Sequence, residues 1–263
     1  MKYSVVKVFC IVLFLGLVSC KDKETAKTAT NTEQFEANEA AMESHENQQR
    51  GPVYKYVMVP SGLSLRKSNT LDSEKLAGMP FRSRVEVLEE RTETAIEVEH
   101  IKGGMHKIKY EDKVGYAFSG FLSQFPMPQE EEEGTDAYIA KLKENFSGVN
   151  YKSKSNDPDF HEGMTDTYTL PAASWSEAYY LAAAMFQFPT KLGFPGAKGA
   201  DMETIEDPEK DQDTWDSFLT VEREKNKLKK INFSYRAEGY GYGIDIIRKS
   251  DELFQFEHLA FVD

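Results

Sequence analysis

SFLTVER (217–223), KKINFSYR (229–236), YGIDIIRK (242–249) and ELFQFEHLAFVD (252–263) are four stretches in which apolar and polar residues alternate. Alternation with a period of two is typical of β-strands that bury one face. Because the connections between the stretches are short and turn-like, we expect an antiparallel meander. On its strands, one face groups Ile231, Phe233 and Tyr235, and another groups Phe254, Phe256, His258, Ala260 and Val262.

Two segments before the meander carry apolar residues at helical spacing, DAYIAKLKENF (136–146) and SWSEAYYLAAAMFQF (174–188). In the second segment, Ser174 is followed three residues later by Glu177, which is the capping-box pattern of a helix N-terminus. Pro189 is expected to end this helix. The sequence therefore predicts two helices in this part of the chain.

The remaining segments of this part, 150–166 and 189–214, are expected to be loops. The first is polar, and the second is long and rich in glycine, proline and acidic residues. Helices followed by an antiparallel meander are typical of the α+β class. We therefore predict an α+β domain (helices plus antiparallel meander) of unknown function over residues 136–263.

Residues 54–125 consist of short apolar alternations separated by turn residues, which indicates a small all-β domain. Within it, SGLSLRKSNTLDSEKLAGMPFRSRVEVL (61–88) is similar to the opening of bacterial SH3-like domains. KVGYAFSGFLS (113–123) is similar to the close of the same domains. This resemblance implies an all-β SH3-like barrel over residues 51–125.

The resemblance also implies a ligand site, because aromatic rings usually form the peptide groove of such domains. The ligand-binding candidates are Tyr56, Tyr110, Tyr116, Phe118 and Phe121. Packing in the core and at its rim is the alternative role for these side chains, since aromatic residues pack more often than they bind.

The first residues of the chain have the pattern of an exported lipoprotein. A basic start and an apolar run predict a signal peptide over residues 1–19. Leu17-Val18-Ser19-Cys20 resembles a bacterial lipobox, which implies that Cys20 is lipidated, for example with palmitate, and anchors the chain to a membrane. Because Lys21 follows the cysteine, the resemblance favours the outer membrane of the cell envelope.

Two segments are expected to connect the parts of the chain. Residues 20–50 are polar and lack large apolar side chains, so we expect a disordered tether. Residues 126–135, PMPQEEEEGT, combine prolines with four consecutive glutamates and are expected to be an acidic linker.

Composition excludes several classes of function. The only cysteines are Cys10 and Cys20, so a mature chain that begins at an acylated Cys20 has no thiol nucleophile and no cysteine-based metal site. A formal charge of −12 argues against nucleic acid as a partner. The five histidines form no zinc motif, and the alternating acids of EDPEKDQD (206–213) favour a solvated loop, with calcium as the alternative. We therefore expect no metal and no cofactor.

These observations predict a non-enzymatic envelope lipoprotein. It would use its SH3-like domain to bind a peptidoglycan peptide or an envelope protein partner. One alternative is a wall-active hydrolase whose site lies in residues 136–263. Another is an inhibitor or immunity-type lipoprotein.

Overall fold

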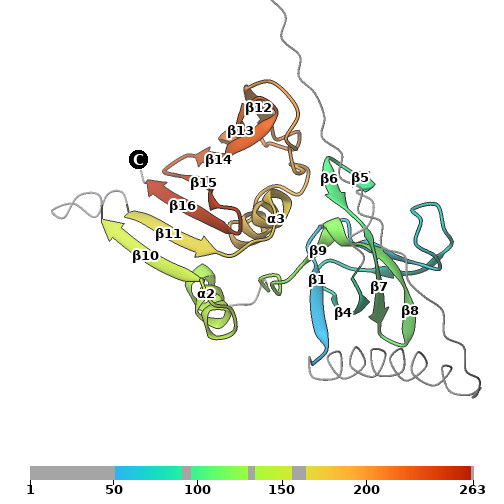
Figure 1. Cartoon of the computed structure of the whole chain (residues 1–263). Helices are drawn as coiled ribbons and strands as arrows, with labels where there is room; N and C mark the ends of the chain where they lie inside the picture. Colours follow the sequence, from blue (N-terminus) through green and yellow to red (C-terminus); the bar gives the residue numbers. More distant parts are fainter. Residues whose placement is uncertain (1–50, 91–95, 130–133, 156–163, 262–263) are drawn as a thin grey trace, which may run out of the picture. The chain divides into compact units, whose positions relative to one another are not determined.

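Two antiparallel seven-stranded sheets dominate the computed structural model, which describes residues 51–90, 96–129, 134–155 and 164–261 (Figure 1). The first sheet has the strand order β3-β2-β8-β7-β4-β1-β9, and β5 and β6 form a separate two-stranded sheet. These strands are β1 (Val53–Val57), β2 (Leu63–Arg66), β3 (Lys75–Met79), β4 (Arg84–Glu89), β5 (Ile96–Val98), β6 (Ile101–Gly103), β7 (Met105–Tyr110), β8 (Lys113–Phe118) and β9 (Leu122–Ser123), with the 3₁₀-helix η1 (Ser119–Phe121) before β9.

The second sheet has the order β10-β11-β16-β15-β14-β13-β12, so β13 to β16 lie side by side in chain order as the predicted meander, and β12 adds one more strand at its edge. Lys225 and Asn226 have positive φ angles in the two-residue turn between β13 and β14, a backbone that suits the twist of a hairpin. The strands are β10 (Asn150–Ser155), β11 (Met164–Leu170), β12 (Met202–Glu206), β13 (Thr214–Glu224), β14 (Lys227–Ala237), β15 (Tyr240–Ser250) and β16 (Leu253–Phe261).

The predicted fold class, an all-β SH3-like barrel followed by an α+β domain, is wrong. Strands make up 51% and helices 14% of the structure, and the described residues form only two α-helices, α2 (Gly134–Asn145) and α3 (Trp175–Met185). Segments expected to be loops supply β10, β11 and β12. Their sequences carry few apolar side chains, but β10 and β12 are edge strands, which need to bury little.

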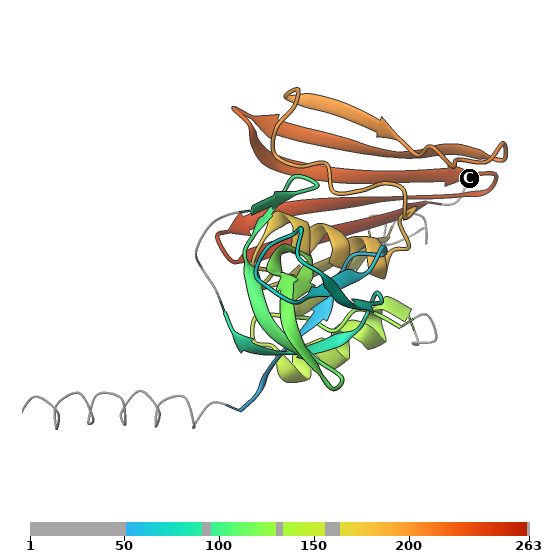
Figure 2. The same cartoon turned by 90° about the vertical axis from the view of Figure 1, so that its right-hand side faces the viewer.

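Helix α3 covers one face of the second sheet, and Figure 2 shows it beneath the strands. We call this face the inner face. It is defined by the buried side chains of Leu219, Phe233, Ile244 and Phe256, one from each strand of the meander. The helix begins as predicted, because the Ser174 hydroxyl accepts a hydrogen bond from the Glu177 amide at 3.1 Å. Its fully buried alanines, such as Ala182, allow the helix backbone to approach the sheet closely.

The Glu177 side chain links α3 to the first sheet. One carboxylate oxygen accepts hydrogen bonds from the Ser123 hydroxyl at 2.7 Å and from the Gln124 amide at 2.8 Å. The other oxygen accepts a hydrogen bond from the Ala173 amide at 2.7 Å. Glu177 is only 4% exposed, so this link lies in the interior of residues 52–263, which form one compact unit.

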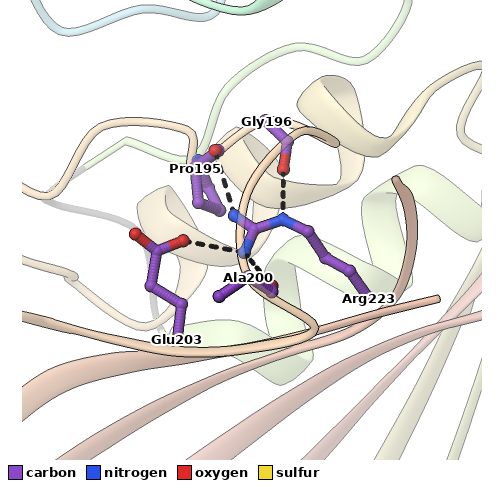
Figure 3. A network of polar contacts seen from close by, with 5 residues as sticks. All are labelled: Pro195, Gly196, Ala200, Glu203 and Arg223. Carbon is purple, nitrogen blue, oxygen red and sulfur yellow. Dashed lines mark hydrogen bonds and ion pairs between the residues drawn. The ribbon is translucent and has the colours of Figure 1, made fainter. Parts of the chain in front are cut away.

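Arg223 links the segment between α3 and β12 to the second sheet (Figure 3). Its guanidinium donates hydrogen bonds to three backbone carbonyls and forms an ion pair of 2.7 Å with Glu203. The carbonyls belong to Pro195 (3.3 Å), Gly196 (3.2 Å) and Ala200 (3.0 Å). A segment that was expected to be a long loop is therefore fixed at one end by a single buried arginine.

Several predictions fall outside the described residues. These are the signal peptide (1–19), the tether (20–50) with Cys20, and the glutamates of the acidic linker within 130–133. None of the helices in the described ranges is long and apolar enough to cross a membrane.

Candidate functional site

One end of the inner face is polar and forms the candidate site. The inward positions continue past the helix-covered core, and there Leu219 gives way to Ser217 and Phe233 to Tyr235. Strand pairing places Ser217 opposite Tyr235, Tyr235 opposite Tyr242, and Tyr242 opposite Ala260. The sheet therefore presents a row of hydroxyl-bearing side chains where its apolar core ends.

A cavity of about 560 Å³ lies over this row, and we call it the tyrosine pocket. Its volume is in the range of small-molecule sites. Its floor comes from the meander, and its walls come from the end of α3 and from the turn between β12 and β13. The lining residues are Met185, Phe186, Gln187, Pro189, Asp207, Glu209, Lys210, Asp211, Thr214, Ser217, Phe233, Tyr235, Tyr240, Tyr242 and His258.

The tyrosine pocket exists because α3 stops before the end of the sheet. Its last helical residue is Met185, and Gln187 has a left-handed backbone (φ 55°) that turns the chain away. The Tyr242 hydroxyl donates a hydrogen bond of 3.0 Å to the Phe186 carbonyl at this helix end. Burial raises the pKa of Tyr242, so its hydroxyl keeps its proton at neutral pH.

A chain of polar contacts reaches the pocket wall at His258. The His258 Nδ1 atom lies 3.6 Å from one Asp166 carboxylate oxygen, and the Tyr151 hydroxyl donates to the other oxygen at 3.0 Å. The His258 ring stacks on Phe186 with centroids 5.3 Å apart. Burial lowers the pKa of His258 below its usual range, and the nearby Asp166 carboxylate offsets this only in part. His258 is therefore mainly neutral at pH 7.

The rim of the tyrosine pocket is acidic. Asp207 accepts hydrogen bonds from the Ser217 hydroxyl at 2.9 Å and from the Glu209 amide at 2.9 Å. Asp211 accepts from the Thr214 amide at 2.8 Å, so these acids shape the turn between β12 and β13. Within the described ranges, no group of three or more acidic, histidine or cysteine side chains is placed to hold a metal ion.

The structure distributes the predicted aromatic candidates differently. Phe118 and Phe121 are buried in the core with ring centroids 5.1 Å apart, and Tyr110 and Tyr116 are half-buried against it. Tyr56 lines a second cavity, of about 500 Å³, together with side chains of α2. None of the five residues lines the tyrosine pocket.

A third cavity, of about 870 Å³, is larger than the tyrosine pocket. It lies between residues 58–61 and 81–82 on one side and α3 with residues 187–193 on the other. Burial raises the pKa of Tyr180, which lines this third cavity, to about 12. The tyrosine pocket holds two half-buried groups with a shifted pKa, Tyr242 and His258, and one of them is an imidazole. Because perturbed titratable groups concentrate at functional sites, the tyrosine pocket is the better candidate.

Sequence reasoning placed Tyr235 and His258 on strand faces but did not identify them as site residues. One sequence feature could have identified them: at successive inward positions of these strands, apolar side chains are followed by hydroxyl-bearing and imidazole side chains.

Comparison of the chain with protein-family models, with characterised proteins and with solved structures finds no match. The resemblance of residues 61–88 and 113–123 to bacterial SH3-like domains therefore stays a prediction.

The lowered pKa of His258 predicts a pH-dependent stability. In the unfolded chain this histidine takes up a proton near pH 6.5, whereas the folded state takes it up only at lower pH. Its contribution to the free energy of unfolding is thus fully present above pH 6.5 and is lost as the pH falls through the folded pKa. Urea unfolding at pH 7.5 and pH 5.5 should show a smaller loss of stability for His258→Gln than for the unmodified chain.

His106 provides the internal comparison, because burial and the nearby Lys55 lower its pKa as well. It lies in β7, in the first sheet, away from the tyrosine pocket. The double variant with His106→Gln should be less pH-dependent than either single variant. Equal pH dependence of His258→Gln and the unmodified chain would mean that His258 titrates normally.

Proposed function

We propose that the chain is a lipid-anchored envelope protein that binds a cell-wall peptide, without chemical turnover, in the tyrosine pocket. The observation that carries the proposal is a solvent-open cavity whose floor is a row of tyrosines and whose rim is acidic. Such a site offers apolar area, hydrogen-bonding groups and charge to a small polar ligand. The predicted anchor at Cys20 would raise the local concentration of a weak binding site near the cell wall.

Contacts within the pocket favour binding over catalysis. The Ser217 hydroxyl donates to Asp207, and the Tyr242 hydroxyl donates to the Phe186 carbonyl. A serine nucleophile is typically activated by a histidine, whereas the Ser217 hydroxyl is held by a carboxylate that also accepts a backbone amide in the turn between β12 and β13. The histidine that lines the pocket, His258, lies on β16, and β14 and β15 stand between it and Ser217 on β13.

Co-sedimentation with purified peptidoglycan tests the proposal. The full chain with Cys20→Ala, which removes the predicted lipidation, should pellet with peptidoglycan. Tyr240→Ala should reduce the pelleted fraction, because Tyr240 is an exposed wall of the pocket (45% exposed). Tyr54→Ala is the matched control, since Tyr54 is also an exposed tyrosine (38%) but lies outside the pocket.

If the chain does not pellet, or if both tyrosine variants lose pelleting equally, the proposed site is wrong. The pairing of His258 with Asp166 favours one alternative function, a wall-active hydrolase with His258 as its base. The same samples distinguish it, because a hydrolase would release soluble fragments from peptidoglycan and His258→Gln would abolish that release. Pelleting without release supports binding alone.

A further inference from the structure

We infer that the tyrosine pocket recognises an ammonium group, and that its ligand is therefore a cell-wall peptide with a free amino group. This inference rests on the proposed function and specifies which chemical group of the ligand is bound. Three features of the pocket lead to it: its aromatic wall, the charges on its rim, and the engagement of its own basic side chains.

The first feature is the aromatic wall. Tyr235, Tyr240 and Tyr242 form one cluster, in which the Tyr242 ring centroid lies 5.5 Å from that of Tyr235 and 5.8 Å from that of Tyr240. Phe233 extends this cluster, with its centroid 5.9 Å from that of Tyr242. Aromatic faces attract cations through their quadrupole, and clusters of such rings hold ammonium ligands.

The second feature is the charge at the mouth of the pocket. Asp207, Glu209 and Asp211 lie on the rim, and the whole chain carries a formal charge of −12. An acidic rim around a low-dielectric wall raises the local concentration of cations. It also repels anions, so a peptide would enter with its amino group first.

The third feature is that the basic side chains near the pocket already have partners. Lys210 donates to the Trp215 carbonyl at 3.2 Å and lies 3.9 Å from the Glu206 carboxylate. Lys191 lies 3.8 Å from Glu209. Burial lowers the pKa of His258, which is therefore mainly neutral at pH 7. The ligand cation therefore meets little unbalanced positive charge in the cavity.

Calorimetric titration of the full chain with muramyl tripeptide tests the inference. The only free amino group of this probe is the one on its diaminopimelate side chain. We expect the probe to bind, and we expect acetylation of that amino group to weaken binding by about ten-fold or more, because both the cation–π and the charge contacts are lost. Equal affinity for the two probes would overturn the inference and leave the proposed function standing.

Two conservative variants assign the effect to the pocket. Tyr240→Leu keeps apolar area but removes a ring face, and Glu209→Gln removes a rim charge; each should weaken binding of the free amine by about two- to five-fold. Neither should change binding of the acetylated probe. Glu74→Gln is the control for Glu209→Gln, because both carboxylates are exposed and both pair with a lysine.

Failure of the proposed function is recognised separately. If muramyl tripeptide does not bind, the wall-peptide assignment is wrong, and titration with tetramethylammonium then decides the inference. Shifts of the Tyr240 and Tyr242 ring signals in NMR spectra would support an ammonium site for another amine. Unchanged ring signals would overturn the inference as well.

Discussion

Replacing Glu177 with alanine should lower the free energy of unfolding by about 3–5 kcal/mol, because its carboxylate accepts three hydrogen bonds and each buried donor left unpaired costs about 1–3 kcal/mol. The change leaves the amides of Gln124 and Ala173 and the hydroxyl of Ser123 without their acceptor. Ser123 is fully buried and Gln124 is half-buried, so water cannot readily replace the carboxylate there, whereas Ala173 is exposed. Urea denaturation followed by circular dichroism measures the difference.

Two further variants show whether the carboxylate itself is responsible. Glu177→Gln keeps the shape of the side chain and one acceptor oxygen, but its NH2 group faces the Ala173 N–H and cannot accept that hydrogen bond. We therefore expect the free energy of unfolding to fall by about 2 kcal/mol. Glu144→Ala removes an exposed glutamate from α2 and should change stability by less than about 0.5 kcal/mol. A loss below about 1 kcal/mol for Glu177→Ala would mean that the link to the first sheet contributes little.

Glu177 also shows how far sequence reasoning reached. The spacing from Ser174 predicted the capping box, and the Ser174 hydroxyl does accept from the Glu177 amide. The carboxylate, however, bonds to Ser123 and Gln124, which lie 54 and 53 residues earlier in the chain. A local motif predicts a helix start, but it carries no information about a partner on a distant strand.

Strand β11 explains why the fold class was missed. Its inward residues are Asp166, Tyr168 and Leu170, and the first of them is polar because it stands behind His258 at the pocket. A polar residue at an inward position breaks the alternation that identifies a strand. The meander strands kept enough apolar inward residues to be predicted, while β10 and β12 are stabilised mainly by backbone pairing with a neighbour.

The tyrosine pocket could be predicted only in part for a similar reason. Alternation placed Tyr235 with Ile231 and Phe233, and His258 with Phe254 and Phe256. The apolar members of both groups are buried, whereas Tyr235 and His258 are half-buried at the pocket. The pocket itself depends on the register between strands and on the residue at which α3 ends. Both are properties of the folded chain, set by contacts such as the Tyr242 hydrogen bond to Phe186.

Replacing Arg223 with alanine is expected to have the second large effect, a loss of about 3–4 kcal/mol in the free energy of unfolding. The Arg223 side chain is fully buried and satisfies the carbonyls of Pro195, Gly196 and Ala200 (Figure 3). Hydrogen bonds from a charged donor are worth more than neutral ones, and truncation also leaves a cavity. Denaturation with urea at pH 7.5 measures the loss.

Arg223→Lys separates charge from geometry. A lysine keeps the ion pair with Glu203, but it lacks the planar guanidinium that donates to three carbonyls at once. Arg223→Lys should therefore recover less than half of the stability that Arg223→Ala loses. Arg248→Ala is the matched control, since Arg248 is an exposed arginine on strand β15 of the same sheet and its loss should cost less than about 1 kcal/mol. Hydrogen exchange should be faster at amides of residues 195–201 in Arg223→Ala. Unchanged exchange there would show that the segment is held by other contacts.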